Sequence, residues 1–264
     1  MVKALPFRAN VRNIRRMSPG QAISTAVILA AGRGVRLRAD GVELPKPLHA
    51  VGERTLLERA ITTLTRAGMR RVIVVVGYRG ELIRDAVRSN PRLAALGVSI
   101  EIAQSLDETK SNGSSVLAIE GLVDGPFLLA MCDHVYDVEL AVAAAAADMS
   151  LASLWLCVDR RLDEIYDMDD ATKVQTDSAH IVDIGKELQT FDAIDCGVFA
   201  AGLPLLTALR TLWDRTGDAS MSDGVKLLVE QRQARTIDIG NAFWQDVDTP
   251  GALLRAERIL AGGA

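Results

Sequence analysis

Between residues 24 and 147, short apolar runs alternate with segments that carry apolar residues at helical spacing. The runs are residues 26–30, 71–76, 98–102 and 127–131, and the helical segments are residues 55–67, 81–87, 113–120 and 138–147. Parallel strands need long crossover connections, and helices normally supply them. The alternation therefore predicts an α/β fold on a doubly wound, mostly parallel, Rossmann-like sheet.

The alternation of strand-like and helical segments stops after residue 151, where strand-like segments follow one another with polar turns between them. These segments are residues 151–158, 171–175, 181–184 and 192–199; residues 204–213, 223–230 and 250–261 return to helical spacing, and residues 236–239 form one more strand-like run. This pattern predicts a small antiparallel substrate lobe, about residues 151–202, lying over the edge of the sheet. A chain of 264 residues with no repeat and no long linker fits a single domain, which we place at residues 23–264.

Charge is distributed unevenly along the chain. Residues 1–20 contain five basic residues and no acid, whereas the rest of the chain contains 25 basic and 34 acidic residues. We expect residues 1–22 to form a flexible basic extension, with contact to a membrane surface or a partner as the alternative. The acidic body and an aromatic content of 4% argue against nucleic-acid binding, which depends on phosphate neutralisation and base stacking.

The chain contains no stretch that approaches the ~20 uncharged apolar residues of a membrane helix, so we expect no membrane span. The cysteines Cys132, Cys157 and Cys196 are scattered and form no Cys-x-x-Cys pair. This spacing excludes a zinc ribbon and a disulfide scaffold and suits a reducing compartment. We therefore expect a cytoplasmic protein.

The densest chemical signal follows the first apolar run. Leu29-Ala30-Ala31-Gly32-Arg33-Gly34-Val35-Arg36-Leu37 is followed by Pro45-Lys46-Pro47-Leu48. Glycines let the backbone approach a ligand, and consecutive N–H groups form a concavity that binds anions. Arg36 and Lys46 would add two positive charges for a polyphosphate; the alternative is a glycine turn with two solvated basic residues. The segment lacks the third glycine of a Rossmann fingerprint and the Gly-Lys-Ser/Thr of a P-loop.

Carboxylates follow two other strand-like segments. Asp133 comes directly after residues 127–131, at the carboxyl end of a predicted parallel strand, where open α/β sheets bind ligands. It is a candidate Mg²⁺ ligand, or else the N-cap of the helix that begins near Val138. Asp246 and Asp248 stand two residues apart, so on an extended strand both side chains would face one site. Alternatively, Asp248 or Thr249 could cap the helix that has Pro250 in its first turn.

The nine-residue segment that ends the first strand, followed by Lys-Pro-Leu, resembles the signature of sugar-phosphate nucleotidylyltransferases. Val35 departs from that signature, because the family usually has Thr or Ser there. The resemblance implies the nucleotide-diphospho-sugar transferase fold and a metal site on Asp133 and Asp246, with Asp248 as second ligand or cap. It also implies that Arg36, Lys46 and Asp133 are catalytic. The nucleotide contacts that it implies are Leu29, Ala30, Ala31, Gly32, Gly34 and Arg36 in the first loop, and Asn112, Gly113 and Ser114 in a polar segment that could otherwise be a surface turn.

Further motifs narrow this resemblance. Met-x-Asp-His-Val-Tyr, Ala-Thr-Lys-Val, Ile-Gly-Lys-Glu-Leu, Phe-Asp-x-x-Asp-x-Gly-x-Phe and Trp-x-Asp-Val-Asp-Thr occur in one order and are similar to those of CTP:inositol-1-phosphate cytidylyltransferases over residues 24–262. That family transfers a cytidylyl group from CTP to myo-inositol 1-phosphate for phospholipid biosynthesis, with Mg²⁺ as cofactor. The acceptor-binding residues that it implies are Lys186, Asp195, Gly197, Lys173 and His134.

Members of that family are often fused to a membrane-embedded phosphotransferase, and because this sequence ends at Ala264 we expect the stand-alone form. The alternatives are another phosphorylated acceptor (a sugar 1-phosphate, phosphocholine or a phosphonate) or a non-catalytic nucleotide-binding regulator. The sequence leaves open whether the chain forms a homodimer.

Overall fold

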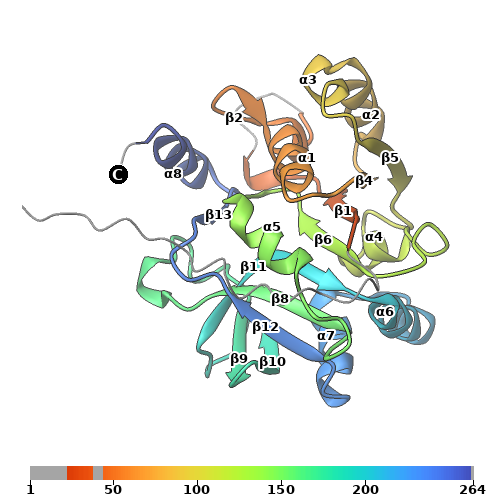
Figure 1. Cartoon of the computed structure of the whole chain (residues 1–264), viewed down its shortest axis with the longest axis vertical. Helices are drawn as coiled ribbons and strands as arrows, with labels where there is room; N and C mark the ends of the chain where they lie inside the picture. Colours follow the sequence, from red (N-terminus) through yellow and green to blue (C-terminus); the bar gives the residue numbers. More distant parts are fainter. Residues whose placement is uncertain (1–22, 38–43, 263–264) are drawn as a thin grey trace, which may run out of the picture.

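The computed structural model describes residues 23–37 and 44–262, so the expected basic extension at residues 1–22 lies outside the described residues. The central feature is a nine-stranded sheet with the strand order β5-β4-β1-β6-β11-β8-β12-β10-β9. Helices cover both of its faces (Figure 1), as expected for a doubly wound fold.

One half of the sheet is parallel, as the sequence predicts. It contains β1 (Thr25–Ala30), β4 (Arg71–Val76), β5 (Ser99–Gln104) and β6 (Phe127–Met131). The elements that connect them include α1 (Leu56–Arg66), α2 (Gly80–Ser89), α3 (Pro91–Ala94) and α4 (Gly113–Leu117), and α5 (Val138–Ala145) follows β6. Short elements lie between β1 and α1: η2 (Val35–Leu37), η3 (Lys46–Leu48), β2 (Ala50–Val51) and β3 (Arg54–Thr55).

The other half confirms the predicted antiparallel pairing of residues 151–202 and adds β12, which pairs parallel with β8. Its strands are β8 (Leu154–Asp159), β9 (Lys173–Asp177), β10 (His180–Gly185), β11 (Ala193–Ala201) and β12 (Ala234–Asp238), with η4 (Leu162–Glu164) after β8. β11 pairs antiparallel with β6 and with β8, so the lobe continues the main sheet rather than lying over its edge. β9 pairs with β10 and also with β11, so this hairpin folds back towards the centre of the sheet.

Alternate residues of the central strands enter two separate cores. Val27 and Leu29 pack in one core beneath α4, α6 (Leu203–Thr216) and α7 (Met221–Glu230). Ile28 packs in the other, beneath α1, α2 and α5. Because successive side chains on a strand point to opposite faces, a continuous apolar run such as β1 fits a sheet that is covered on both sides.

A small second sheet was not predicted from the sequence. It pairs β7 (His134–Tyr136) antiparallel with β13 (Trp244–Asp246), and the register sets Asp246 opposite His134. α8 (Pro250–Leu260) follows β13. This pairing brings β13 close to the carboxyl end of β6 (Figure 1). In the part of the chain that the structure describes, no helix is both long enough and apolar enough to cross a bilayer.

Candidate active site

A cavity of about 400 Å³ lies where the carboxyl end of β6, the lobe and the β13–α8 segment meet. Its volume is in the range of small-ligand pockets. It is lined by residues from distant parts of the chain, among them Asp133, His134, Asp170, Lys186, Asp195 and Asp246. The structure therefore brings most of the predicted metal and acceptor residues into one site.

Lys46 is buried among the predicted metal-binding carboxylates. Its side chain is 7% exposed, and Nζ donates to Asp133 Oδ2 at 2.6 Å and contacts Asp248 Oδ1. Asp246 Oδ1 lies 3.8 Å from the same nitrogen. Burial raises the pKa of Asp133, but the charges of Lys46 and His134 and the Lys46 hydrogen bond lower it to about 2. Asp133 is thus an anion at neutral pH.

The alternative role of Asp133 as a helix cap is wrong. α5 begins at Val138, and Asp137 occupies its N-cap position. At α8 the N-cap is Thr249, whose side chain accepts a hydrogen bond from the backbone N–H of Ala252. Asp248 is therefore not the cap either, and its carboxylate contacts Arg36 and Lys46 instead.

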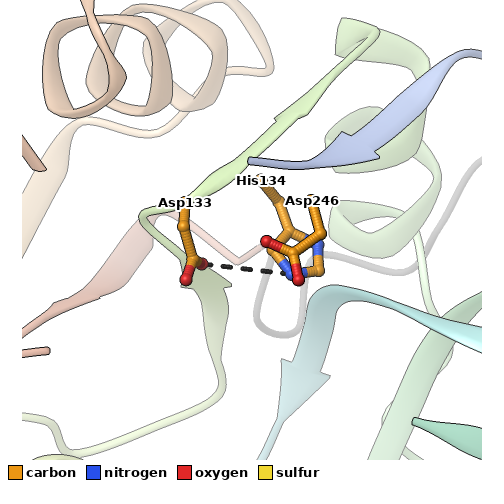
Figure 2. A group of neighbouring side chains, drawn as sticks. All are labelled: Asp133, His134 and Asp246. Carbon is orange, nitrogen blue, oxygen red and sulfur yellow. Dashed lines mark ion pairs between the residues drawn. The ribbon is translucent and has the colours of Figure 1, made fainter. Parts of the chain in front are cut away.

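The carboxylates fit a divalent cation. Ligand atoms of Asp133, His134 and Asp246 lie within 4.8 Å of one another, and those of Asp170, Asp246 and Asp248 form a second such group. Figure 2 shows the first group, which joins the end of β6 to β13. Asp246 Oδ1 is buried and has no hydrogen-bond partner, and burial raises the pKa of Asp246. A buried carboxylate oxygen of this kind is stabilised by a bound cation.

Asp170 is a site residue that the sequence reasoning missed. Its Oδ2 accepts two hydrogen bonds from the Arg36 guanidinium, each 2.9 Å long, and its Oδ1 accepts one from Lys186 Nζ at 2.6 Å. Burial raises the pKa of Asp170, but these hydrogen bonds bring it below its usual value. The available signal was the pair Asp169-Asp170 directly before the Ala-Thr-Lys motif. Asp170 therefore links Arg36, which is predicted to bind the triphosphate, to Lys186, which is predicted to bind the acceptor phosphate.

The first loop needs a glycine at position 34. Gly34 has a φ of +59°, and a Cβ there would lie 2.4 Å from Lys46 Cβ, so the residue allows the loop and Lys46 to meet. Leu29, Ala30 and Ala31 are buried at the end of β1. These three residues, Gly32 and Gly34 are not among the described residues that line the cavity. Gly32 has open space at its Cβ position.

The segment at the start of α4 is tied to the segment before α7. Asn112 lines the cavity, and its side-chain oxygen accepts from the Met221 backbone N–H at 2.9 Å. A Cβ on Gly113 would lie 2.4 Å from the backbone oxygen of Ala219. Ser114 is buried, and its hydroxyl donates to the backbone oxygen of Asp107 at 2.8 Å. The predicted nucleotide contacts of Asn112, Gly113 and Ser114 stay predictions.

The predicted acceptor residues differ in position. Lys186, Asp195, Gly197 and His134 line the cavity, whereas Lys173 is not among its lining residues and donates to the backbone oxygen of Asp169 at 3.4 Å. Asp195 Oδ1 accepts from the Gly197 backbone N–H at 2.7 Å. Burial raises the pKa of Asp195 to about 6 despite this hydrogen bond.

Comparisons with known proteins show which family the chain resembles. Residues 26–180 match the family model described as MobA-like NTP transferase domain. The chain is 32% identical over 248 residues to a "Bifunctional IPC transferase and DIPP synthase" of Rubrobacter xylanophilus, covering 90% of this chain and 52% of the relative. It is 30% identical over 238 residues to the Aquifex aeolicus protein of the same name, with the same two coverages. The chain thus spans about half the length of these curated relatives.

Among solved structures, the inositol-1-phosphate CTP transferase from T. maritima superposes with a TM-score of 0.78 at 26% sequence identity. The superposition covers 92% of this chain and 99% of that chain. It therefore extends well beyond the residues that match the family model.

Proposed function

The chain belongs to the family of MobA-like NTP transferase domains, and from this premise we propose that it transfers the cytidylyl group of CTP to myo-inositol 1-phosphate. The products are CDP-inositol and pyrophosphate. One observation carries the proposal: the likeness to the T. maritima inositol-1-phosphate CTP transferase covers 92% of the chain, and so includes most of the lobe that holds the acceptor candidates.

The reaction needs no general base from the protein. A phosphate monoester has a second pKa near ~6, so the attacking oxygen is largely ionised at neutral pH. This oxygen forms a bond to the α-phosphorus of CTP, and the bond between that phosphorus and the bridging oxygen breaks as pyrophosphate leaves with the electron pair. Catalysis then depends on positioning and on stabilisation of negative charge.

The first loop supplies the triphosphate site in this proposal. Backbone N–H groups around Gly32 and Gly34 would hold the phosphates, and Arg36 and Lys46 would stabilise the charge that develops on the α-phosphate and on pyrophosphate. Arg36 is held by Asp170 in the structure, so phosphate oxygens would take the place of that carboxylate. Leu29, Ala30 and Ala31 at the end of β1, with Asn112, Gly113 and Ser114 at α4, would complete the nucleotide site.

We propose that Asp133 and Asp246, with Asp248, hold Mg²⁺. The buried Asp246 Oδ1, which has no hydrogen-bond partner, and the oxygen-rich surroundings support this assignment, because magnesium prefers oxygen ligands. Bound Mg²⁺ would supply positive charge to the phosphate oxygens of the two substrates. The carboxylates of Asp133 and Asp246 would fix the position of that charge relative to Lys46.

The lobe supplies the acceptor site. Lys186 is the cation for the inositol phosphate, and phosphate oxygens would replace Asp170 as its partner. Asp195 could accept hydrogen bonds from ring hydroxyls near Gly197. Because Lys173 does not line the cavity, we assign the acceptor phosphate to Lys186 rather than to Lys173.

We propose a cytoplasmic location on the basis of the cysteines. All three cysteines are free and buried, as is usual for proteins of reducing compartments.

The test is a panel of CTP, UTP, ATP and GTP against inositol 1-phosphate, glucose 1-phosphate and phosphocholine, scored by pyrophosphate release. The proposal expects CTP with inositol 1-phosphate to turn over fastest. Faster turnover with another acceptor would overturn the acceptor, and faster turnover with UTP would overturn the nucleotide. If the folded protein releases no pyrophosphate with any pair of substrates, the hypothesis that it is an enzyme is overturned in favour of a nucleotide-binding regulator.

A further inference from the structure

We infer that His134 joins Asp133 and Asp246 as a protein ligand of the proposed cation site, and that the site therefore binds Co²⁺ more tightly than Mg²⁺. The inference rests on the proposed function for the presence of a divalent cation. It concerns the protein's own residues and assigns His134 to the cation rather than to the acceptor.

The hydrogen bond of one ring nitrogen sets which nitrogen is free. His134 Nδ1 lies 2.8 Å from the backbone oxygen of Cys196. A carbonyl oxygen only accepts, so Nδ1 must carry the hydrogen and donate it. In the neutral ring the lone pair is then on Nε2, which is the form in which histidine binds a metal.

The ring is held in place by a chain of contacts that ends on the buried Asp159. His134 stacks on Trp244, with the ring centroids 5.6 Å apart and the planes inclined by 19°. Trp244 Nε1 donates to Asp159 Oδ2 at 2.8 Å. Asp159 is 2% exposed and also accepts from Arg161 Nη2 at 2.8 Å. Metal-binding histidines are oriented by outer contacts of this kind.

The backbone next to the ring is shaped to receive it. Gly197 has a φ of +71°, and a Cβ at this position would lie 2.5 Å from His134 Nδ1. A larger residue would therefore push the ring away from the Cys196 carbonyl. Glycine lets the strand β11 approach the imidazole closely enough for the hydrogen bond.

The other ring nitrogen lies towards the carboxylates. Nε2 is 3.9 Å from Asp133 Oδ1, too far for a hydrogen bond. The register of β7 and β13 sets Asp246 directly opposite His134, so the two side chains share one face of that sheet. Figure 2 shows both carboxylates beside the imidazole, and the ligand atoms of the three residues lie within 4.8 Å of one another.

Lys46 forms no hydrogen bond to the two oxygens assigned to the cation, although its Nζ lies 3.8 Å from Asp246 Oδ1. Its Nζ donates to Asp133 Oδ2, whereas the atom of Asp133 that lies towards His134 is Oδ1. Asp246 Oδ1 is buried without a hydrogen-bond partner. The arrangement thus offers one nitrogen and two carboxylate oxygens while Lys46 keeps its own partner on Asp133.

This ligand set predicts an ion preference. Magnesium prefers an all-oxygen environment, whereas an imidazole nitrogen favours transition metals, whose affinities rise from Mn²⁺ through Co²⁺ to Ni²⁺. A site of aspartates alone would gain much less affinity when Co²⁺ replaces Mg²⁺. Metal binding to the full chain without nucleotide therefore distinguishes a site that includes His134 from a site of aspartates alone.

The experiment is titration of the full chain with Co²⁺ and with Mg²⁺ by calorimetry, together with the visible absorption spectrum of the Co²⁺ form. The variants are His134→Asn and His134→Gln. The side-chain nitrogen of Asn is as many bonds from Cα as Nδ1, so it can keep the donor to Cys196 but has no atom at the position of Nε2. Gln places an oxygen or nitrogen at the distance of Nε2. His180→Asn is the matched control, because His180 lies on β10 and contacts Arg235 at 3.3 Å.

We expect His134→Asn to weaken Co²⁺ binding at least about tenfold and to weaken Mg²⁺ binding much less. His180→Asn should change neither affinity. Unchanged Co²⁺ affinity in folded His134→Asn overturns the inference. If that variant does not fold, His134→Gln decides: an altered Co²⁺ spectrum supports nitrogen ligation, and a spectrum identical to wild type overturns it. If His134 is not a ligand, the proposed function still stands, because pyrophosphate release tests it separately. If Co²⁺ binds through His134 but the chain releases no pyrophosphate, the proposed function is overturned and the inference about His134 stands.

Discussion

Replacement of Gly197 by alanine tests how closely β11 and the His134 ring are fitted. Gly197 has a φ of +71°, a conformation that costs an L-residue roughly 1–2 kcal/mol. The new Cβ would also lie 2.5 Å from His134 Nδ1. The ring would have to move and lose its hydrogen bond to the Cys196 oxygen, worth about 0.5–1.5 kcal/mol. We expect Gly197→Ala to lower the free energy of unfolding by about 1.5–3.5 kcal/mol, the sum of these two contributions.

Gly217→Ala is the matched control for backbone strain. Gly217 ends α6 with a φ of +70°, and its Cβ position has nothing within 4 Å. Alanine there should cost only the strain of the left-handed conformation, about 1–2 kcal/mol. The difference between the two variants therefore measures the contact with His134.

The assay is equilibrium unfolding in urea, read for each variant alone and for Gly197→Ala combined with His134→Ala. In the double variant the ring is gone, so the extra cost of Gly197→Ala over Gly217→Ala should disappear. Gly197→Ala should also weaken Co²⁺ binding, and Gly217→Ala should not. Equal losses of stability in the two glycine variants would refute the reasoning, because the ring would then not depend on the missing Cβ.

Four further predictions concern charge in the site. Asp133→Asn should greatly lower turnover in a folded protein, and the remaining activity should need more Mg²⁺; full activity would remove Asp133 from catalysis. Lys46→Ala should lower kcat/KM about 10²–10⁴-fold. An activity loss below about threefold would contradict a role of Lys46 in catalysis. The same variant should lower the free energy of unfolding by roughly 1–3 kcal/mol, because the partly exposed carboxylates around Lys46 lose their counter-charge. Lys186→Ala should raise the KM for inositol 1-phosphate far more than the KM for CTP, and equal effects would mean that Lys186 is misplaced. Burial raises the pKa of Asp195 to about 6, above its unfolded value near ~3.9. Its neutral form therefore stabilises the fold at low pH, and this contribution is lost as pH rises through about 6. Relative to Asp195→Asn, the wild-type free energy of unfolding should fall between about pH 4 and pH 7, and parallel curves for the two proteins would argue against a raised pKa.

The local elements and the first loop could be predicted from the sequence alone. Apolar runs such as β1 and β4 are found where the sequence predicts them, because burial on both faces of a sheet requires continuous apolar residues. The helix α1 agrees within a residue at each end, since Thr55 caps it and its apolar spacing is helical. Asp133 was recognisable because it directly follows a buried strand.

Which of the candidate residues lie together depends on contacts between distant parts of the chain. The three-residue strands β7 and β13 are too short to show a periodic pattern, and they are separated by about half the described chain. Their pairing sets Asp246 opposite His134, and the fold-back of β9 onto β11 accompanies the contact of Asp170 with both Arg36 and Lys186. Likewise, Lys46 is found among carboxylates that lie 87 to 202 residues away in sequence. Local propensity acts over a few residues, whereas such contacts depend on strand order and register, which are set by the packing of the whole sheet.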